Sequence, residues 1–305
     1  DKTMAQTEFI EKVGDYIIRE QSFEEIQSHV ELPFTLCGVN PYGYFQNIRR
    51  FVADLEGKTV GEGWTLTSRY NPWGKLGHYG VFSEEHKRKG LGGRLLELCI
   101  EAVREAGMEA MFIDTGPSVA HTVYEKYGFC DVAPDHPEWL GLSYDGRTIQ
   151  EYLAGYFEVD EEPLEVRELD LSYLTEIQVL LNASVDPDML VKNYLLTLFS
   201  DDQIHEGQIL VEIPALSVSR SEERKIRMLG LFAGSRLIGF STLAPWRTTQ
   251  WDNRHQAHIG LVDLYLHPTL WRRCALLFEE VRRVALKAGF CCLRTMEAYT
   301  TSKAM

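Results

Sequence analysis

The sequence predicts an α/β fold in two domains, and three observations support this prediction. The 305 residues are about twice the size of a common domain. Segments with strand and helix patterns alternate along the first half of the chain. The second half repeats these segments in the same order, and a repeat of this length indicates a duplicated domain rather than a solenoid.

The first half begins with a strand and a capped helix. The Ser-Phe-Glu-Glu sequence at Ser22 is close to a helix N-terminal cap, and Glu56-Gly57-Lys58 is a hairpin signal. Gly107 stands where a helix C-terminal cap belongs, and the Pro- and Gly-rich stretch 32–44 suggests a loop or lid. The expected strands are 16–20, 51–54, 59–66, 78–83 and 110–114, and the expected helices start near 22 and cover 90–106 and 119–126.

The second half shows the same succession. Gly234-Ser235 marks a second hairpin, and Ala288-Gly289 closes a helix as Ala106-Gly107 does in the first half. The acidic stretch 154–163 suggests a junction, so the expected domains are 1–155 and 156–305. The expected strands are 164–168, 227–233, 236–243, 258–267 and 290–295, and the expected helices are 172–182, 189–199 and 268–288.

Composition excludes several classes of protein. The net charge of −14 argues against nucleic-acid binding; it suits a cationic amine substrate, and equally simple solubility. There is no apolar run of membrane-spanning length and no secretory signal at the polar N-terminus, so we expect a cytoplasmic protein without membrane contact. The six cysteines form no C-x-x-C pair, so no metal site and no disulfide framework is expected.

The segment 81–96 carries the strongest chemical signal. A predicted strand runs through the basic turn Lys87-Arg88-Lys89 into a helix start with glycine at 90, 92 and 93. Helix N-termini offer free N–H groups and the positive end of the dipole, which suits a diphosphate. Glycines let phosphate oxygens approach the amides closely. The alternative interpretation is a capped helix start with a solvated basic patch.

The wider context resembles the GNAT acyltransferase superfamily. Lys87 to Gly92 matches its Q/R-x-x-G-x-G/A signature, with lysine in the first position. Tyr124, Gly128 and Phe129 match its downstream Tyr-x-x-x-Gly-Phe element, although Pro117 stands where asparagine is usual, which puts one family hydrogen bond in doubt. The resemblance covers residues 15 to about 132.

This resemblance implies two tandem GNAT-like domains, each a mixed, mostly antiparallel sheet flanked by helices. It implies transfer of an acyl group, most often acetyl, from acetyl-CoA or another acyl-CoA to a small-molecule or peptide amine by direct attack. It places the coenzyme against Val81, Phe82, Ser83, Lys87, Arg88, Lys89, Gly90, Leu91, Gly92, Gly93, Arg94 and Tyr124.

The resemblance also implies catalytic roles. The strand ending at Phe82 and Ser83 would splay from its neighbour and pair with pantetheine amides, and the Phe82 N–H would stabilise the developing oxyanion. Tyr124 stands in the place of the general acid near the leaving sulfur. Because a tyrosine is a weaker acid than a thiol, Tyr124 would act mainly by hydrogen bonding. The alternative is an aromatic side chain that packs a helix on the sheet.

An amine nucleophile must lose a proton, so a base is expected. Glu62, His78 and Tyr79 are the candidates, with Glu62 preferred. Three aromatic residues could wall an acceptor pocket, although hairpin packing explains them equally well: Trp64, Tyr70 and Trp73.

The second half lacks the coenzyme signature. Trp271, Cys274 and Leu276 occupy the positions of the conserved pattern, and no Tyr-x-x-x-Gly-Phe element follows. We therefore expect a degenerate, truncated domain that serves as a scaffold. Three alternatives stay open: a catalytically silent acyl-CoA-binding sensor or scaffold module, transfer to a hydroxyl or thiol or a decarboxylating variant, and a purely structural protein. The acceptor and the oligomeric state cannot be inferred from the sequence.

Overall fold

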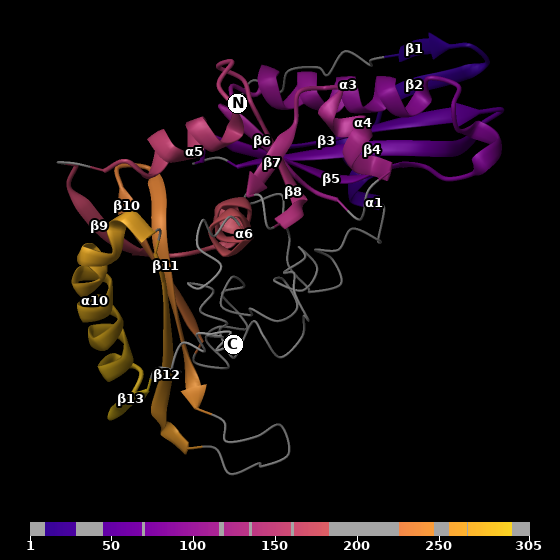
Figure 1. The fold of residues 1–305 in the computed structure, drawn as a ribbon. Coiled ribbons are helices and arrows are strands. Elements are labelled where there is room, and N and C mark those ends of the chain that lie inside the picture. The colour runs from indigo at the N-terminus through magenta and orange to yellow at the C-terminus, as the bar shows by residue number, and fades with distance from the viewer. Residues whose placement is uncertain are drawn as a thin grey trace, which may run out of the picture. The chain divides into compact units, whose positions relative to one another are not determined.

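The computed structural model describes residues 10–28, 45–68, 71–115, 119–133, 136–159, 162–182, 226–246, 256–266 and 268–294 (Figure 1). The chain divides into two compact units, Asp1–Asp131 with Glu138–Ile149, and Val132–Pro137 with Gln150–Met305. The expected loop at 32–44 and the expected helix at 189–199 lie outside the described residues.

The first sheet has eight strands in the order β1-β2-β3-β4-β5-β6-β8-β7. Neighbouring strands from β1 to β8 in this order pair antiparallel, except that β5 and β6 are parallel. The strands are β1 (Ile10–Val13), β2 (Tyr16–Glu20), β3 (Phe45–Leu55), β4 (Lys58–Ser68), β5 (Trp73–Val81), β6 (Ala110–Asp114), β7 (Cys130–Ala133) and β8 (His136–Ser143). The helices of this unit are α1 (Phe23–Ser28), the 3-10 turn η2 (Glu84–His86), α3 (Leu91–Glu105) and α4 (Val119–Glu125). The next helix, α5 (Ile149–Phe157), belongs to the second unit from Gln150 onward.

The hairpin between β3 and β4 follows from its two turn residues. Leu55 pairs with Lys58, and the intervening Glu56 and Gly57 both have positive φ angles, of 50° and 78°. Two left-handed residues form the type I′ turn, whose twist matches that of the flanking strands. The predicted hairpin is confirmed, and its strands are longer than predicted.

Helix α3 packs along one face of this sheet through a stripe of apolar side chains (Figure 1). Two strand glycines let it approach closely. A Cβ atom at Gly63 would lie 2.9 Å from Cys99 Sγ, and one at Gly74 would lie 2.4 Å from Val103 Cγ1. The helix ends at Ala106, and Gly107 follows with a φ of 77°, as the sequence predicts.

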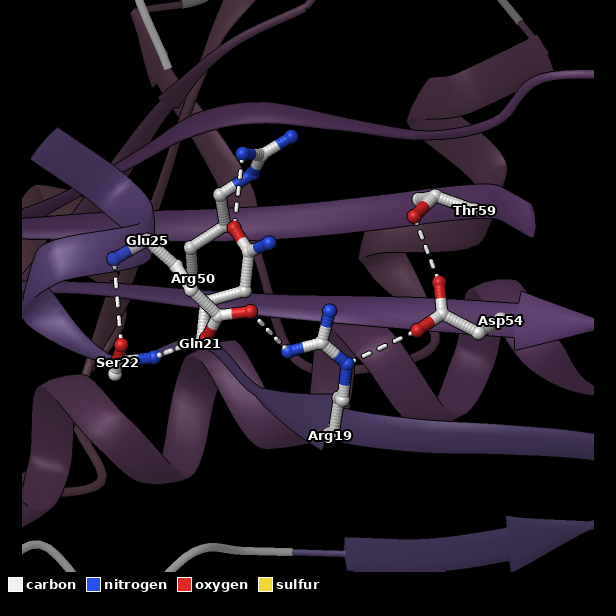
Figure 2. Close-up of polar contacts among 7 residues, drawn as sticks. All are labelled: Arg19, Gln21, Ser22, Glu25, Arg50, Asp54 and Thr59. Atoms are coloured by element: carbon white, nitrogen blue, oxygen red, sulfur yellow. Dashed lines mark hydrogen bonds and ion pairs between the residues drawn. The ribbon is translucent and has the colours of Figure 1, made fainter. Parts of the chain in front are cut away.

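Figure 2 shows the hydrogen bonds that fix the start of α1. The Glu25 N–H donates to Ser22 Oγ (3.2 Å) and the Ser22 N–H donates to Glu25 Oε2 (2.8 Å), which is a reciprocal capping box. Arg19 then donates to Glu25 Oε1 (2.7 Å) and Asp54 Oδ2 (3.0 Å), and Thr59 Oγ1 donates to Asp54 Oδ1 (2.7 Å). The predicted helix start at Ser22 is confirmed, and the network ties α1 to β2, β3 and β4.

The sheet of the second unit has the order β13-β12-β11-β10-β9. Its pairings are antiparallel except for the parallel pair β12 and β13, so it repeats the succession of strand directions from β2 to β6. Its elements are β9 (Leu164–Glu168), η3 (Leu171–Tyr173), α6 (Leu174–Asn182), β10 (Arg227–Ala233), β11 (Arg236–Trp246), β12 (Gln256–Leu266), η6 (Pro268–Arg273), α10 (Cys274–Lys287) and β13 (Cys292–Arg294).

The structure corrects the predicted helix at 268–288. Pro268–Arg273 forms a 3-10 helix, and the α-helix starts only at Cys274, with Arg273 as its N-cap. The long helix of the second unit therefore lacks the left-handed N-cap glycine that α3 has in Gly90.

Candidate active site

The C-terminal half of β5 parts from β6. Gly63 pairs with Tyr79 and Thr65 pairs with Leu76, so Trp64 alone stands opposite two residues of β5. Such a bulge bends a strand and increases its local twist. In the part of the chain that the structure describes, β5 and β6 pair only from Trp73 and Ala110 to Leu76 and Ile113. The edge of β5 beyond the bulge is therefore free of β6.

The register identifies the main-chain groups on this open edge. The Phe82 N–H donates to the Val60 carbonyl at 2.9 Å. Opposed residues of an antiparallel pair exchange hydrogen bonds at every second position, so Phe82 and Gly80 face β4. The amides of Tyr79 and Val81 then face the open side. The expectation that the Phe82 N–H is a free oxyanion donor is therefore wrong, because the β4 ladder continues past Val81.

The start of α3 has the properties of an anion site. Its first helical bond runs from the Arg94 N–H to the Gly90 carbonyl (3.1 Å), which leaves the amides of Leu91, Gly92 and Gly93 as the unpaired donors of the first turn. The first turn carries no acidic residue, and Gly90, with a φ of 85°, has no heavy atom within 4 Å of a built Cβ. Arg88 also has a positive φ, of 61°, a backbone strain that favours a functional role for this loop.

The predicted phosphate-binding cations differ in their surroundings. Lys87 Nζ lies 2.5 Å from Glu84 Oε1, and the side chain of Arg88 is exposed. Arg94 is engaged by Glu11 (2.8 Å) and Glu97 (3.0 Å), and the hydrogen bond that it donates to Glu11 raises the pKa of the guanidinium. Arg94 thus joins β1 to α3, which corrects the expectation that it is available to the coenzyme.

Two of the helix glycines have a packing role that the sequence did not indicate. A Cβ atom at Gly92 would lie 3.0 Å from Tyr79 Oη, and one at Gly93 would lie 2.6 Å from Tyr127 Oη. The side chain of Leu91 is 1% exposed, so only its backbone can contact a ligand.

Ser83, another residue predicted to contact the coenzyme, precedes η2 as its N-cap, and its hydroxyl lies 3.4 Å from Glu85 Oε1.

Tyr124 is buried on α4 beside the open strand edge. Its ring centroid lies 5.8 Å from that of Tyr79 on β5, and its side chain is hydrogen-bonded to Thr115. Burial raises the pKa of Tyr124 to about 12. Proton transfer from such a phenol to a thiolate of ordinary pKa is uphill by about 5 kcal/mol, so Tyr124 can stabilise a thiolate by hydrogen bonding but is a poor proton donor.

Tyr79 does not have the properties of a general base. Burial raises the pKa of its phenol well above the ordinary value, and the neighbouring Tyr124 and Tyr127 raise it further. The phenolate that could accept a proton is therefore scarce at neutral pH. The side chain of the second candidate, His78, lies outside the described part of the chain.

We expect the first unit to lose stability in alkali. Burial raises the pKa values of Tyr79, Tyr124 and Tyr144, so these phenols bind protons in the folded state that the unfolded chain has released. Their contribution is complete below about pH 10 and declines as the pH rises, by about 2 kcal/mol for Tyr124 alone by pH 12. Absorbance at 295 nm should show their ionisation together with the loss of circular dichroism. Ionisation of all tyrosines near pH 10 with the fold intact would contradict this.

Glu62, the preferred base, is paired with an arginine. Arg50 Nε donates to Glu62 Oε2 at 2.8 Å, and a second guanidinium nitrogen contacts the same oxygen. Arg50 also donates to Gln21 Oε1 (2.9 Å), as Figure 2 shows. Both side chains of the ion pair are 12% exposed. Glu62 lies on the sheet face opposite α3, because Gly61 and Gly63 face that helix.

We expect Glu62→Gln to lower the free energy of unfolding by about 2–3 kcal/mol, because it leaves the half-buried Arg50 guanidinium without its counter-charge. The matched control is Glu105→Gln, which breaks the 2.8 Å pair with Arg49 at a glutamate that is 68% exposed and should cost less than about 0.5 kcal/mol. Urea unfolding of both variants measures the difference. Equal effects would show that the Glu62 pair is not structural.

The expected acceptor-pocket wall is mostly interior. Trp64 is 4% exposed and covers Gly77, while Trp73 is 1% exposed and packs on Phe112 with centroids 4.8 Å apart. The packing interpretation of these two residues is therefore confirmed. Tyr70 lies outside the described residues.

Two other kinds of feature are absent from the described segments. They hold no cluster of three or more side chains arranged to bind a metal ion, and no helix of the length and apolarity needed to cross a bilayer.

The fold and the site define a mixed α/β domain in which a parted strand pair meets a helix that starts after a left-handed glycine. Residues 18–129, which run from β2 to the Phe129 that follows α4, match the family model described as the acetyltransferase (GNAT) family. The resemblance of this part of the chain to the GNAT superfamily, seen in the sequence, is therefore confirmed.

Many solved structures are similar to parts of the chain. A GNAT family acetyltransferase from Brucella melitensis in complex with acetyl-CoA is 14% identical, with 42% of this chain and 88% of that chain covered and a TM-score of 0.31. The ribosomal-protein-S18-alanine N-acetyltransferase from Escherichia coli is 18% identical, with 38% and 78% covered and a TM-score of 0.30. A GNAT family acetyltransferase from Elizabethkingia anophelis with acetyl-CoA bound is 19% identical, with 39% and 78% covered and a TM-score of 0.28. No curated protein matched the chain.

Proposed function

We propose that the first domain, residues 1–155, is an acyl-CoA-dependent N-acyltransferase that transfers an acyl group, most often acetyl, to a small-molecule or peptide amine. The observation that carries this proposal is the parting of β5 from β6 beside the open start of α3. The family match of residues 18–129 supports it, and two of the similar structures contain acetyl-CoA.

The residues at this opening fit an acyl-CoA thioester, which would supply the activated acyl group. The unpaired amides of the first turn of α3 suit the diphosphate, with Lys87, Arg88 and Lys89 adding positive charge. The open edge of β5 suits the amides of the pantetheine arm, as a peptide adds to a sheet edge. These contacts would hold the thioester beside Tyr79, Val81 and Tyr124.

The reaction needs two kinds of stabilisation. The amine attacks the thioester carbonyl, and the amides of Tyr79 and Val81 would donate to the oxygen as it gains negative charge. As the carbon–sulfur bond breaks, the Tyr124 hydroxyl would donate a hydrogen bond to the leaving thiolate. The proton lost by the amine passes to a base, for which Glu62 is available only if its pairing with Arg50 is rearranged.

That ion pair favours a second candidate function, a catalytically silent acyl-CoA-binding sensor or scaffold module. A thiol-release assay with acetyl-CoA and a broad panel of amines, run beside calorimetric titration with acetyl-CoA, distinguishes the two. We expect binding and amine-dependent thiol release. Binding without thiol release would support the silent module, and no binding would contradict both functions.

We further propose that residues 156–305 are a degenerate GNAT-like scaffold domain, which makes the chain a tandem protein. The strand directions of β9 to β13 support this, because they repeat those of β2 to β6. Cys274 and Leu276 stand at the positions of the signature glycines, and a 3-10 segment precedes α10. The net charge of −14 supports a protein that does not bind nucleic acid, and we propose a cytoplasmic location.

A further inference from the structure

The loop before α3 is fastened to a distant strand by one tyrosine. Tyr16, the first residue of β2, is 5% exposed, and its hydroxyl oxygen lies 3.1 Å from both His86 Nδ1 and Lys89 Nζ. Its ring is edge-on to that of His86, with centroids 5.8 Å apart, and lies 5.7 Å from Lys89 Nζ. His86 and Lys89, which follow Tyr16 by 70 and 73 positions in the sequence, thus both contact its side chain.

Counting donors gives this contact a direction. A lysine ammonium only donates, so Tyr16 accepts from Lys89 and has one proton to give. We assign that proton to a hydrogen bond with His86 Nδ1 as the acceptor, which places the ring proton of His86 on Nε2. His86 Nε2 lies 3.2 Å from Glu85 Oε1, which is a suitable acceptor. The order Lys89 to Tyr16 to His86 to Glu85 gives the Tyr16 hydroxyl one donor and one acceptor and gives each ring nitrogen of His86 a partner.

The two anchored residues flank the strained part of the loop. Arg88, with its φ of 61°, lies between His86 and Lys89, and left-handed Gly90 follows directly. A non-glycine residue persists in this conformation only when its surroundings hold it there. Tyr16 supplies two of those contacts, and it is itself held by burial in the core under β2 and α3.

We propose that Tyr16 is a positioning residue for coenzyme binding: it orders the loop Lys87–Gly90 and aims the Lys89 ammonium at the diphosphate. This inference rests on the proposed function of the opening beside α3. Tyr16 touches no reacting atom in this scheme, so its loss should weaken binding of the coenzyme and leave the chemical step almost unchanged.

The test compares Tyr16→Phe with Tyr144→Phe in the full chain. Both variants keep an aromatic ring packed on the same core, buried for Tyr16 and partly buried for Tyr144, and lose one hydroxyl. Tyr144 Oη donates to the Ile100 carbonyl at 3.1 Å, away from the loop. We expect Tyr16→Phe to raise the Kd and KM for acetyl-CoA about tenfold, because the variant loses the two hydrogen bonds that order the loop. The kcat should stay within about twofold of the wild-type value. Tyr144→Phe should leave all three values unchanged. Thermal unfolding measures the stability cost of each variant.

A second variant keeps the inference testable if Tyr16→Phe folds poorly. His86→Phe preserves a ring against Tyr16 but removes the acceptor, and we expect it to raise Kd severalfold in the same direction. If the wild-type chain binds acetyl-CoA and the folded variants bind it with the same Kd, the role of Tyr16 would be overturned while the proposed function would stand. A fall in kcat without a change in Kd would overturn it as well. A wild-type chain that binds no acetyl-CoA would overturn the proposed function and this inference together.

Discussion

Gly90→Val should reduce the affinity for acetyl-CoA about a hundredfold or more, the largest binding effect that we expect from a single substitution. Gly90 has a φ of 85° and forms the N-cap of α3. A β-branched residue strongly disfavours this conformation, so the chain would turn to a negative φ and redirect the amides that follow. The same substitution also places methyl groups in the open space where the diphosphate would lie. Calorimetric titration with acetyl-CoA measures the loss.

Gly107→Val is the matched control for this variant. Gly107 lies at the other end of the same helix, has a φ of 77°, and likewise has no heavy atom within 4 Å of a built Cβ. Both substitutions should therefore cost a similar strain, of about 1–2 kcal/mol. Only Gly90→Val should lose the coenzyme. Equal affinity in the two variants would show that the start of α3 is not the binding site.

Tyr124→Phe should lower kcat about a hundredfold and leave the Kd for acetyl-CoA unchanged within about twofold. The expected loss is that of one hydrogen bond made to the thiolate only as it leaves. The phenol stays protonated well beyond neutral pH because burial raises its pKa to about 12, so no loss of Tyr124 function should appear in the pH profile of kcat below about pH 10. Loss of the bond to Thr115 should cost about 1 kcal/mol of stability.

Thiol release at saturating acetyl-CoA, with Tyr144→Phe as the control for loss of a buried hydroxyl, tests this expectation. Unchanged turnover in Tyr124→Phe would remove Tyr124 from the mechanism and leave it the packing role suggested by its contact with Phe129, at 5.9 Å between ring centroids. A parallel rise in Kd would instead place the tyrosine in binding.

Elements with a strong local signal could be predicted from the sequence. The strands Tyr16–Glu20 and Ala110–Asp114 and the helix that starts at Gly90 were predicted almost to the residue, because alternation, capping and glycine signals agree there. The strand β1 was missed because none of its residues is buried, so it shows no apolar pattern. Strand β5 was predicted to start five residues late, because Gly74 and Gly77 suggest a break, whereas they make room for Val103 and Trp64.

The parts of the site that depend on local sequence spacing could be predicted. The parts that depend on strand register and on contacts between distant residues could not. The basic turn and the glycine start follow from spacing in the sequence. Which amides face the opening depends on the register of β4 against β5, which no local pattern contains, and so Phe82 was chosen instead of Val81 and Tyr79. The engagement of Glu62 by Arg50 and of Arg94 by Glu11 likewise joins residues far apart in sequence.

The strand edge left open beyond Leu76 has a consequence for how the protein behaves when nothing is bound. Unpaired main-chain donors and acceptors are a template onto which any extended segment can add, and natural proteins shield them to avoid self-association. The bulge opposite Trp64 gives part of that shielding by twisting the edge away from flatness. Under the proposed function the coenzyme would cover this edge, so we expect the protein to self-associate less in concentrated solution with acetyl-CoA than without it.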